Sequence, residues 1–316
     1  MSDIKRSSSL YFPDGNIVLI AENCAFRVHA SFLARHSQIF EDLFQLPQPQ
    51  PSEMFDGCPI VRLSDSKKEI RYLLQIFYDG SVDAFSASSK ALDFLAVSIM
   101  LRLGSKYGIE FIRNEAIVRL EKCFPSTFEE YDKLRRSQYY DAEEKTGIVI
   151  KHPMLLTKVD AFDVLELARQ FDLRSIMKAA WYLAAQNPLE KLADYLEKKR
   201  INHTDFTACI LDQESLVRAN FHGYSEIIYL YQRFRVGYVD PSDKCLELLL
   251  NAWHDTSLSF SLSSHDPLST PEEYSLEAHL DDAAICAECT EEIIHQTKEQ
   301  RRAIFNGLPS FMKGMS

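Results

Sequence analysis

The first part of the chain changes its hydrophobic period twice. Residues 17–21 form a continuous apolar run between turn-forming residues, which is typical of a buried strand. Residues 26–30 then alternate apolar and polar, as in a half-buried strand, so the two runs predict a β-hairpin. From residue 32 to residue 44 apolar side chains recur at helical spacing, with Ser31 placed to cap the start. We predict one helix there.

Helices dominate the pattern after this point. Residues 60–63 predict a third strand, and Ser64–Ser66 offers N-caps for the helix that follows. Two further helices are predicted over residues 90–103 and 109–122, separated by glycines. Residues 10–124 therefore combine early strands with later helices, which indicates a domain of the α+β class.

The remainder of the chain is predicted to be mostly α-helical. Residues 125–152 are polar and predict a linking segment with room for a short helix. Residues 153–316 show successive helical patterns and form the predicted C-terminal region, in which residues 272–305 are interpreted as one long acidic helix. Residues 1–9 are polar and serine-rich, and we expect them to form a disordered lead-in.

Composition and charge narrow the function classes. The 316 residues suffice for about two domains, and 46% hydrophobic with 26% charged residues is ordinary for a globular protein. The net charge of −11 argues against nucleic acid as a direct partner. We find neither a signal peptide nor a membrane-spanning segment. The seven scattered cysteines suit reduced thiols, so we expect a cytoplasmic or nuclear protein without a membrane partner.

An ordered set of phrases in the N-terminal part resembles the BTB/POZ domain. These phrases are Asp14–Ile20, Phe26–Ala30, Leu33–Phe44, Val61–Asp65 and Leu73–Gly80. More narrowly, the chain is similar to the large set of BTB proteins from mushroom-forming fungi. The phrases that carry this second likeness are Asp56–Pro59, Leu103–Tyr107, Ala168–Leu173, Cys286-x-x-Cys289 and Leu308-Pro309. The resemblance covers residues 10–124 specifically and the helical region loosely.

The resemblance implies a module for protein–protein interaction. Its partners would be a second copy of the domain, a cullin scaffold of a ubiquitin ligase, or a corepressor. Residues where the family uses its surface toward cullins are the interaction candidates. They are Phe40, Asp42, Leu43, Phe44, Met54, Phe55 and Tyr107.

Two departures from the family's zinc-finger repressor branch narrow these options. Asn16 and Ala30 stand where that branch has an aspartate and an arginine, which argues against corepressor binding. A short polar stretch precedes the first strand, so a homodimer is expected to form without the swapped N-terminal helix. His29 is interpreted as a structural, hydrogen-bonded histidine. Ser37 is interpreted as a packing or back-bonding residue inside the predicted helix.

We find no motif of a nucleotide-binding loop, an esterase elbow, a zinc protease or a kinase. The sequence therefore predicts a non-enzymatic protein that needs no cofactor. The leading hypothesis is a substrate adaptor for a cullin-RING ubiquitin ligase. The alternatives are a self-associating scaffold linked to transcriptional regulation and, more remotely, a hydrolase with an unrecognised motif.

The motif that most resembles a metal-binding site is Cys286-x-x-Cys289. On a helix the two cysteines would lie roughly 60° apart on one face, and His279 would project close to Cys286. A fourth ligand could come from Cys245 or His254. Without a second pair at zinc spacing, a single C-x-x-C is more typical of cysteines that pack in a core. The sequence therefore predicts no metal, with Cys286, Cys289 and His279 as the residues to check.

Overall fold

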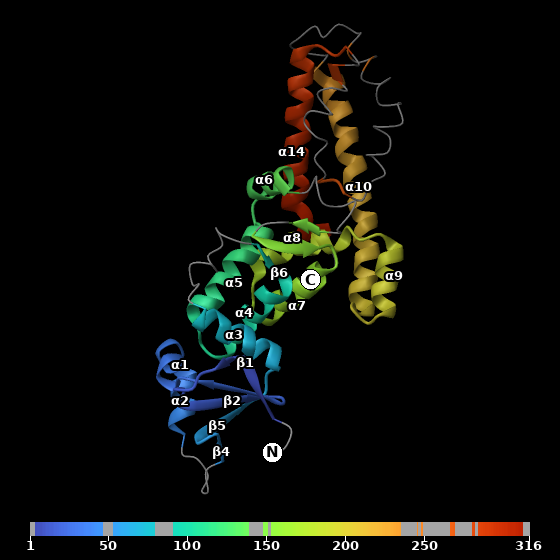
Figure 1. Cartoon of the computed structure of the whole chain (residues 1–316). Helices are drawn as coiled ribbons and strands as arrows, with labels where there is room; N and C mark the ends of the chain where they lie inside the picture. Colours follow the sequence, from blue (N-terminus) through green and yellow to red (C-terminus); the bar gives the residue numbers. More distant parts are fainter. Residues whose placement is uncertain are drawn as a thin grey trace. The chain divides into compact units, whose positions relative to one another are not determined.

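The computed structural model describes most of the chain, in two compact units (Figure 1). The described residues are 4–46, 53–79, 91–138, 148–150, 153–234, 245, 248, 266–268, 280–281 and 284–311. The first unit comprises Met1–Cys123 with Lys151–Leu155, and the second comprises Phe124–Ile150 with Leu156–Ser316. None of the helices in these ranges combines the length and apolarity that a membrane span requires.

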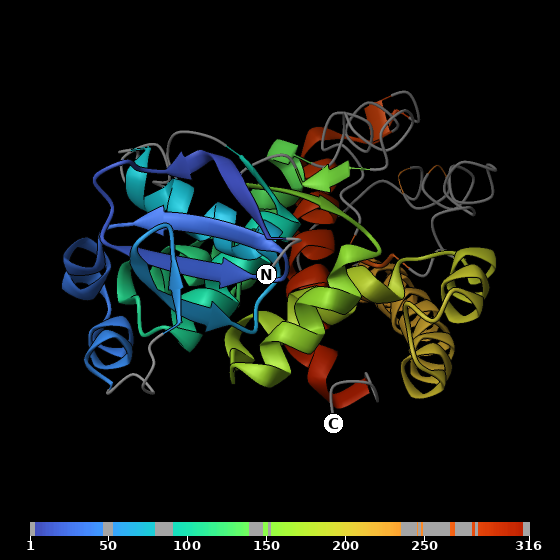
Figure 2. The ribbon, with the colours of Figure 1, turned by 60° about the horizontal axis from the view of Figure 1, so that its bottom comes forward.

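The first unit is built on a five-stranded sheet with the order β1-β3-β2-β5-β4. Figure 2 shows the blue strands of this sheet side by side. Its strands are β1 (Lys5–Tyr11), β2 (Ile17–Ala21), β3 (Cys24–Val28), β4 (Met54–Phe55) and β5 (Cys58–Leu63). The predicted hairpin is confirmed, since β2 and β3 pair antiparallel. The third predicted strand is confirmed as β5, which pairs in parallel with β2. All residues of β2 are buried, as a continuous apolar run requires.

Strand β1 overturns part of the expectation for the N-terminus. The prediction that residues 1–9 form a disordered lead-in is wrong for residues 5–9, which belong to β1; this strand pairs in parallel with β3 at Lys5, Arg6 and Tyr11. Only Ser7 and Leu10 of β1 are buried, so the strand shows no strict alternation of polar and apolar residues. Its pairing with β3 stabilises the strand where local hydrophobicity does not.

Helices pack beside this sheet. They are α1 (Ala30–His36), α2 (Gln38–Gln45), α3 (Lys67–Tyr78), α4 (Phe94–Lys106) and α5 (Glu110–Cys123). Helix α3 contacts β1 and β2, and it starts at Ser66 with a capping box to Glu69, as the predicted cap position allowed. Helices α4 and α5 approach closely at Gly104, where an added Cβ would lie 2.8 Å from the backbone nitrogen of Arg113. The short strand β6 (Leu92–Asp93) pairs with Met154 and Leu155.

The single helix predicted from residue 32 to residue 44 is two helices in the structure. Ser37 separates α1 from α2 with an extended backbone (φ −151°, ψ 112°). Its hydroxyl oxygen accepts a hydrogen bond from the backbone nitrogen of Phe40 at 3.0 Å, so Ser37 is the N-cap of α2. The predicted cap Ser31 lies inside α1, whose N-cap position is occupied by His29 without a side-chain cap.

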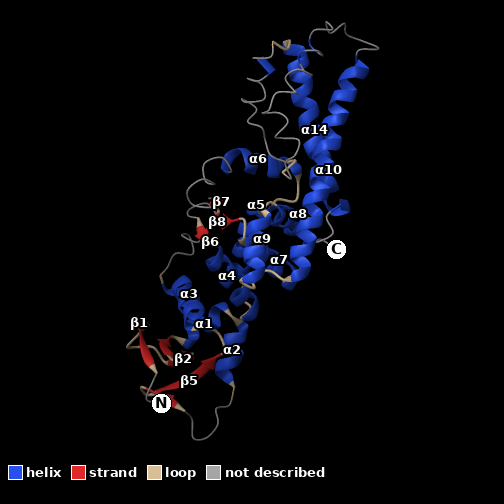
Figure 3. Cartoon of the chain, turned by 90° about the vertical axis from the view of Figure 1, so that its right-hand side faces the viewer, coloured by secondary structure: helices blue, strands red, loops and turns tan. Residues whose placement is uncertain are grey.

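The second unit is mostly helical, as predicted. Its elements are α6 (Phe128–Gln138), β7 (Ile148–Ile150), the end of β8 (Met154–Thr157), α7 (Asp160–Gln170), α8 (Arg174–Ala185), α9 (Leu189–Glu197), α10 (His203–Phe234) and α14 (Ala287–Phe311). Residues 125–152, expected to link the two parts, contain α6 and β7. The long helices α10 and α14 lie side by side (Figure 3). Trp181 is fully buried in this unit and donates a hydrogen bond to Asp212 at 2.7 Å.

Charged groups are also built into the packing of the second unit. Arg135 contacts the Asp266 carboxylate at 2.9 Å, and the Tyr182 hydroxyl donates to the same carboxylate at 2.5 Å. Burial by itself would raise the pKa of Asp266, but the Arg135 charge and these hydrogen bonds outweigh burial and lower it. Arg301 pairs with Asp132 at 2.5 Å, and both side chains are buried. Removing one member of such a pair leaves an uncompensated charge.

The start of α14 differs from the long helix predicted over residues 272–305. Ala284 has a left-handed backbone (φ +58°), and α14 begins only at Ala287. The backbone nitrogen of Ile285 bonds the carbonyl of Leu280 at 3.0 Å, which closes the turn. Cys286 therefore precedes the helix, and the prediction that it sits on a continuous helical face is wrong.

Candidate functional site

Two of the predicted interaction residues are buried. Phe40 is 0% exposed and Tyr107 is 4% exposed, and their rings stack with centroids 4.5 Å apart. The Tyr107 hydroxyl donates to the Asp65 carboxylate, and burial together with this bond raises the Tyr107 pKa. These two aromatics hold α2 against the end of α4, so their assignment to an interaction surface is wrong.

The other predicted interaction residues reach the surface. Asp42 and Met54 are exposed, and Leu43, Phe44 and Phe55 are half-buried. Phe44 stacks on the buried Phe40 with centroids 5.7 Å apart, so it belongs partly to the core. The five residues come from two elements, α2 and the edge strand β4.

A groove of about 950 Å³ lies beside α2 in the first unit. Helices α1 and α2 and the start of α5 line it, and its walls include Ala34, Glu41, Phe44 and Phe111. Charged side chains, such as Arg35 and Glu110, lie among the apolar ones in this lining. A partner protein would therefore meet apolar and polar groups together, as at many protein interfaces.

Exposed apolar side chains lie on the same elements as the groove. Ile39 of α2 is 43% exposed, Phe111 of α5 is 36% exposed, and Leu46, the C-cap residue directly after the groove residue Gln45, is 58% exposed. Ile39 lies beside Gly108, a groove residue, since its Cδ1 is 3.7 Å from an ideal Cβ at that glycine. The sequence reasoning missed Ile39, Leu46 and Phe111. Phe111 carried a usable signal, because it directly precedes the buried Ile112 and so lies off the core face of α5.

An aromatic cluster packs against Phe111. The His36 ring lies 5.9 Å from Phe111 and 5.5 Å from Phe77, and Phe32 lies 5.4 Å from His36. Tilted and edge contacts at these distances favour a fixed ring arrangement. The groove wall is therefore preorganised by side chains from α1, α3 and α5.

Asn16 and Ala30, which stand where the repressor branch has an aspartate and an arginine, form an uncharged contact. The backbone nitrogen of Ala30 donates to Asn16 Oδ1 at 2.9 Å, so no charge pair stands here. His29 meets the expectation of a hydrogen-bonded structural residue. Its backbone nitrogen lies 3.0 Å from the Tyr78 hydroxyl, and its Nε2 lies 3.3 Å from the Asp14 carboxylate.

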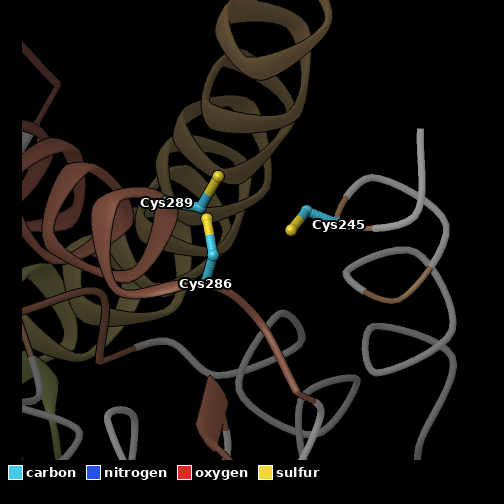
Figure 4. Close-up of side chains that lie close together, drawn as sticks. All are labelled: Cys245, Cys286 and Cys289. Atoms are coloured by element: carbon cyan, nitrogen blue, oxygen red, sulfur yellow. The ribbon is translucent and has the colours of Figure 1, made fainter. Parts of the chain in front are cut away.

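A cluster of three cysteines lies in the second unit. The sulfur atoms of Cys245, Cys286 and Cys289 all lie within 4.8 Å of one another (Figure 4). A hydrogen bond from the Cys289 backbone and thiol contacts from Cys289 and Cys245 lower the pKa of Cys286. His279 and His254, considered as further ligands, lie outside the described residues.

Two buried cysteines outside this cluster have a raised pKa. Burial raises the pKa of Cys123 and of Cys209 to about 12, so both thiols stay protonated and unreactive at neutral pH. None of the seven cysteines forms a disulfide. The three clustered cysteines are set apart from the other four by their mutual proximity, and Cys286 also by its exposure and its lowered pKa.

A sheet flanked by paired helices, with a groove beside α2, defines the first unit as an α+β domain with a surface suited to another protein. The family model of the BTB/POZ domain matches residues 14–116. The chain therefore carries an N-terminal BTB/POZ domain, followed by a mostly helical region. This domain is a module for protein interaction rather than a catalytic fold. No curated protein matches the chain.

Proposed function

We propose that this protein is a non-enzymatic substrate adaptor of a cullin-RING ubiquitin ligase. The BTB/POZ domain binds the cullin scaffold, and the helical second unit recognises the protein to be modified. A cytoplasmic or nuclear location belongs to this proposal. The observation that carries it is the groove beside α2 together with three exposed apolar residues: Ile39 and Phe111 at the groove, and Leu46 at the C-terminal end of α2.

The energetics favour a helical partner at this groove. Covering a large apolar side chain completely is worth about 1.5–3 kcal/mol, and these three residues are partly exposed. A few such anchors supply most of the affinity of a typical interface. Helices commonly dock apolar anchors into grooves of this kind. The lining carries both signs of charge, in Arg35, Glu41 and Glu110, which favours partner residues of matching opposite charge at each position.

The experiment measures binding of the purified full chain to the N-terminal domain of a BTB-binding cullin by calorimetry. Leu46→Asp places a charge on the proposed surface and should weaken binding at least ~10-fold, because a buried unpaired charge is costly. Leu189→Asp is the matched control. Leu189 is 55% exposed at the start of α9, so this variant keeps residue type and exposure while leaving the groove intact.

Equal cullin affinities of wild type and Leu46→Asp would show that the surface beside α2 does not bind the cullin. A wild-type chain that binds no cullin would refute the adaptor role itself. An affinity pull-down from cells, read by mass spectrometry, then identifies the proteins held by the second unit.

The self-associating scaffold linked to transcription is the second candidate. The observation in its favour is β1, an edge strand of the sheet whose outer side can pair with another strand. Light scattering of the full chain across a concentration series separates the two candidates. A dimer that persists without any cullin binding supports the scaffold, whereas a monomer that binds a cullin supports the adaptor.

A further inference from the structure

Three cysteines from two separate segments converge in the second unit. Cys286 immediately precedes α14 and Cys289 lies in its first turn, while Cys245 comes from a segment about 40 residues earlier. Figure 4 shows the Cys245 side chain directed toward the other two. The sulfur atoms lie within 4.8 Å of one another. Cys245 and Cys289 are 5% and 9% exposed, and Cys286 is exposed.

The spacing of the sulfur atoms suits a shared metal ion. A Zn–S bond is about 2.3 Å, so two thiolates of a tetrahedral site lie about 3.8 Å apart. Shifts of about 1 Å or less would bring the three sulfurs from their observed positions to that separation. A disulfide would use only two of the three thiols. The third cysteine therefore favours a metal over a simple redox pair.

The surroundings hold the three thiols in place. Cys245 and Cys289 pack with Leu280, Ile285 and Ile293 in one apolar cluster. The backbone nitrogen of Thr290 bonds the carbonyl of Cys286 at 3.0 Å, which places Cys286 at the N-cap of α14. The positive end of the helix dipole favours negative ligands at this position. Side-chain packing and backbone geometry thus hold the three sulfur atoms close to one another.

We propose that Cys245, Cys286 and Cys289 bind one Zn²⁺ ion, which ties Cys245 to the start of α14. Thiolate sulfur is a ligand set that selects Zn²⁺ over Mg²⁺ or Ca²⁺, which take oxygen ligands. On binding, the thiols release their protons to solvent and the sulfurs donate electron pairs to the metal. The three sulfurs leave the fourth position of the zinc tetrahedron to a further ligand. This proposal is independent of the adaptor role.

The first measurement is the zinc content of the reduced, untagged full chain after reconstitution with Zn²⁺ and dialysis. We expect one equivalent per chain. Titration with Co²⁺ gives an independent signal, because thiolate-to-cobalt charge transfer reports sulfur ligands directly. Addition of Zn²⁺ should then displace Co²⁺ and abolish that absorption.

The variants Cys245→Ser, Cys286→Ser and Cys289→Ser should each weaken metal binding at least ~10-fold and reduce the charge-transfer absorption. Cys209→Ser is the matched control, since Cys209 is buried in α10 outside the cluster and should leave both signals unchanged. Cys286→Ser is the most informative variant. Its side chain is exposed, so the change leaves no cavity, and circular dichroism verifies the fold.

Several results would overturn the proposal. Wild type and Cys209→Ser that take up neither Zn²⁺ nor Co²⁺ would show that the cluster binds no metal. Wild-type binding in a folded Cys286→Ser variant would move the metal elsewhere. A Cys286–Cys289 disulfide that forms readily in a chain without zinc affinity would assign the cluster to thiol redox chemistry.

A thermal measurement can support the proposed site. Zinc should raise the melting temperature of wild type but not of Cys286→Ser.

Discussion

Replacing Ser37 by alanine distinguishes the structure from the sequence pattern, because the two predict opposite signs. Within one continuous helix, Ser→Ala would be neutral or stabilise by a few tenths of a kcal/mol, since alanine is the best helix former. In the structure Ser37 is the N-cap of α2 and is 2% exposed. Ser37→Ala should therefore destabilise the first unit.

The magnitude follows from two hydrogen bonds. The Ser37 oxygen accepts from the Phe40 backbone nitrogen at 3.0 Å, and losing a serine cap costs about 1 kcal/mol. The Ser37 hydroxyl also donates to the buried Tyr107 carbonyl at 2.5 Å. Leaving that carbonyl without this donor costs about 1–3 kcal/mol more, so the sum is about 2–4 kcal/mol.

Urea unfolding of the full chain, followed by hydrogen exchange of peptides from the first unit, measures this effect. With a urea m-value of about 1–3 kcal/mol/M, the midpoint should fall by roughly 1 M or more. Ser31→Ala is the control, because Ser31 is exposed inside α1 and should change stability by less than about 0.5 kcal/mol. If Ser31→Ala proved the more damaging of the two, the break at Ser37 would be refuted.

Two further predictions concern packing and pH. Gly104→Ala should destabilise the first unit despite the better helix propensity of alanine, because the new Cβ would lie 2.8 Å from the Arg113 backbone nitrogen; an unchanged or raised melting temperature would contradict this. The pKa of Asp266 is lowered in the folded state, so its ionised form contributes stability at neutral pH that is lost as pH falls below the unfolded value of about 3.9. The advantage of wild type over Asp266→Asn in urea midpoint should therefore shrink between pH 7 and pH 3, and a constant advantage would rule out the ion pair as its source.

The parts of the fold that were predictable from sequence are those specified by neighbouring residues. The β2–β3 hairpin and the capping box of α3 each lie within a short stretch, where apolar period and cap residues act directly. The break at Ser37 has a different origin. Its hydroxyl bonds Tyr107, 70 positions along the chain, and no local pattern records that partner.

The same distinction explains the errors at the candidate sites. Phe40 occupies a helical position that the family likeness placed at a surface, yet the flat face of Tyr107 covers it. The face of Cys286 was deduced from an uninterrupted helix, and the left-handed Ala284 removes that premise. The convergence of Cys245 with the C-x-x-C pair depends on tertiary packing. The sequence identified these cysteines as candidates, but it could not show that their three sulfur atoms lie within 4.8 Å of one another.

The two proposals can fail independently because their residues belong to different compact units. The groove and Leu46 lie in the first unit, while the cysteine cluster lies entirely in the second. Cys286→Ser should therefore leave cullin affinity unchanged while lowering the zinc content. Leu46→Asp should lower the cullin affinity and leave the zinc content unchanged. If Cys286→Ser reduced the capture of proteins by the second unit but left cullin affinity intact, the metal would have a role in forming the surface that recognises substrates, because metal-linked folding stabilises only the elements that carry the ligands.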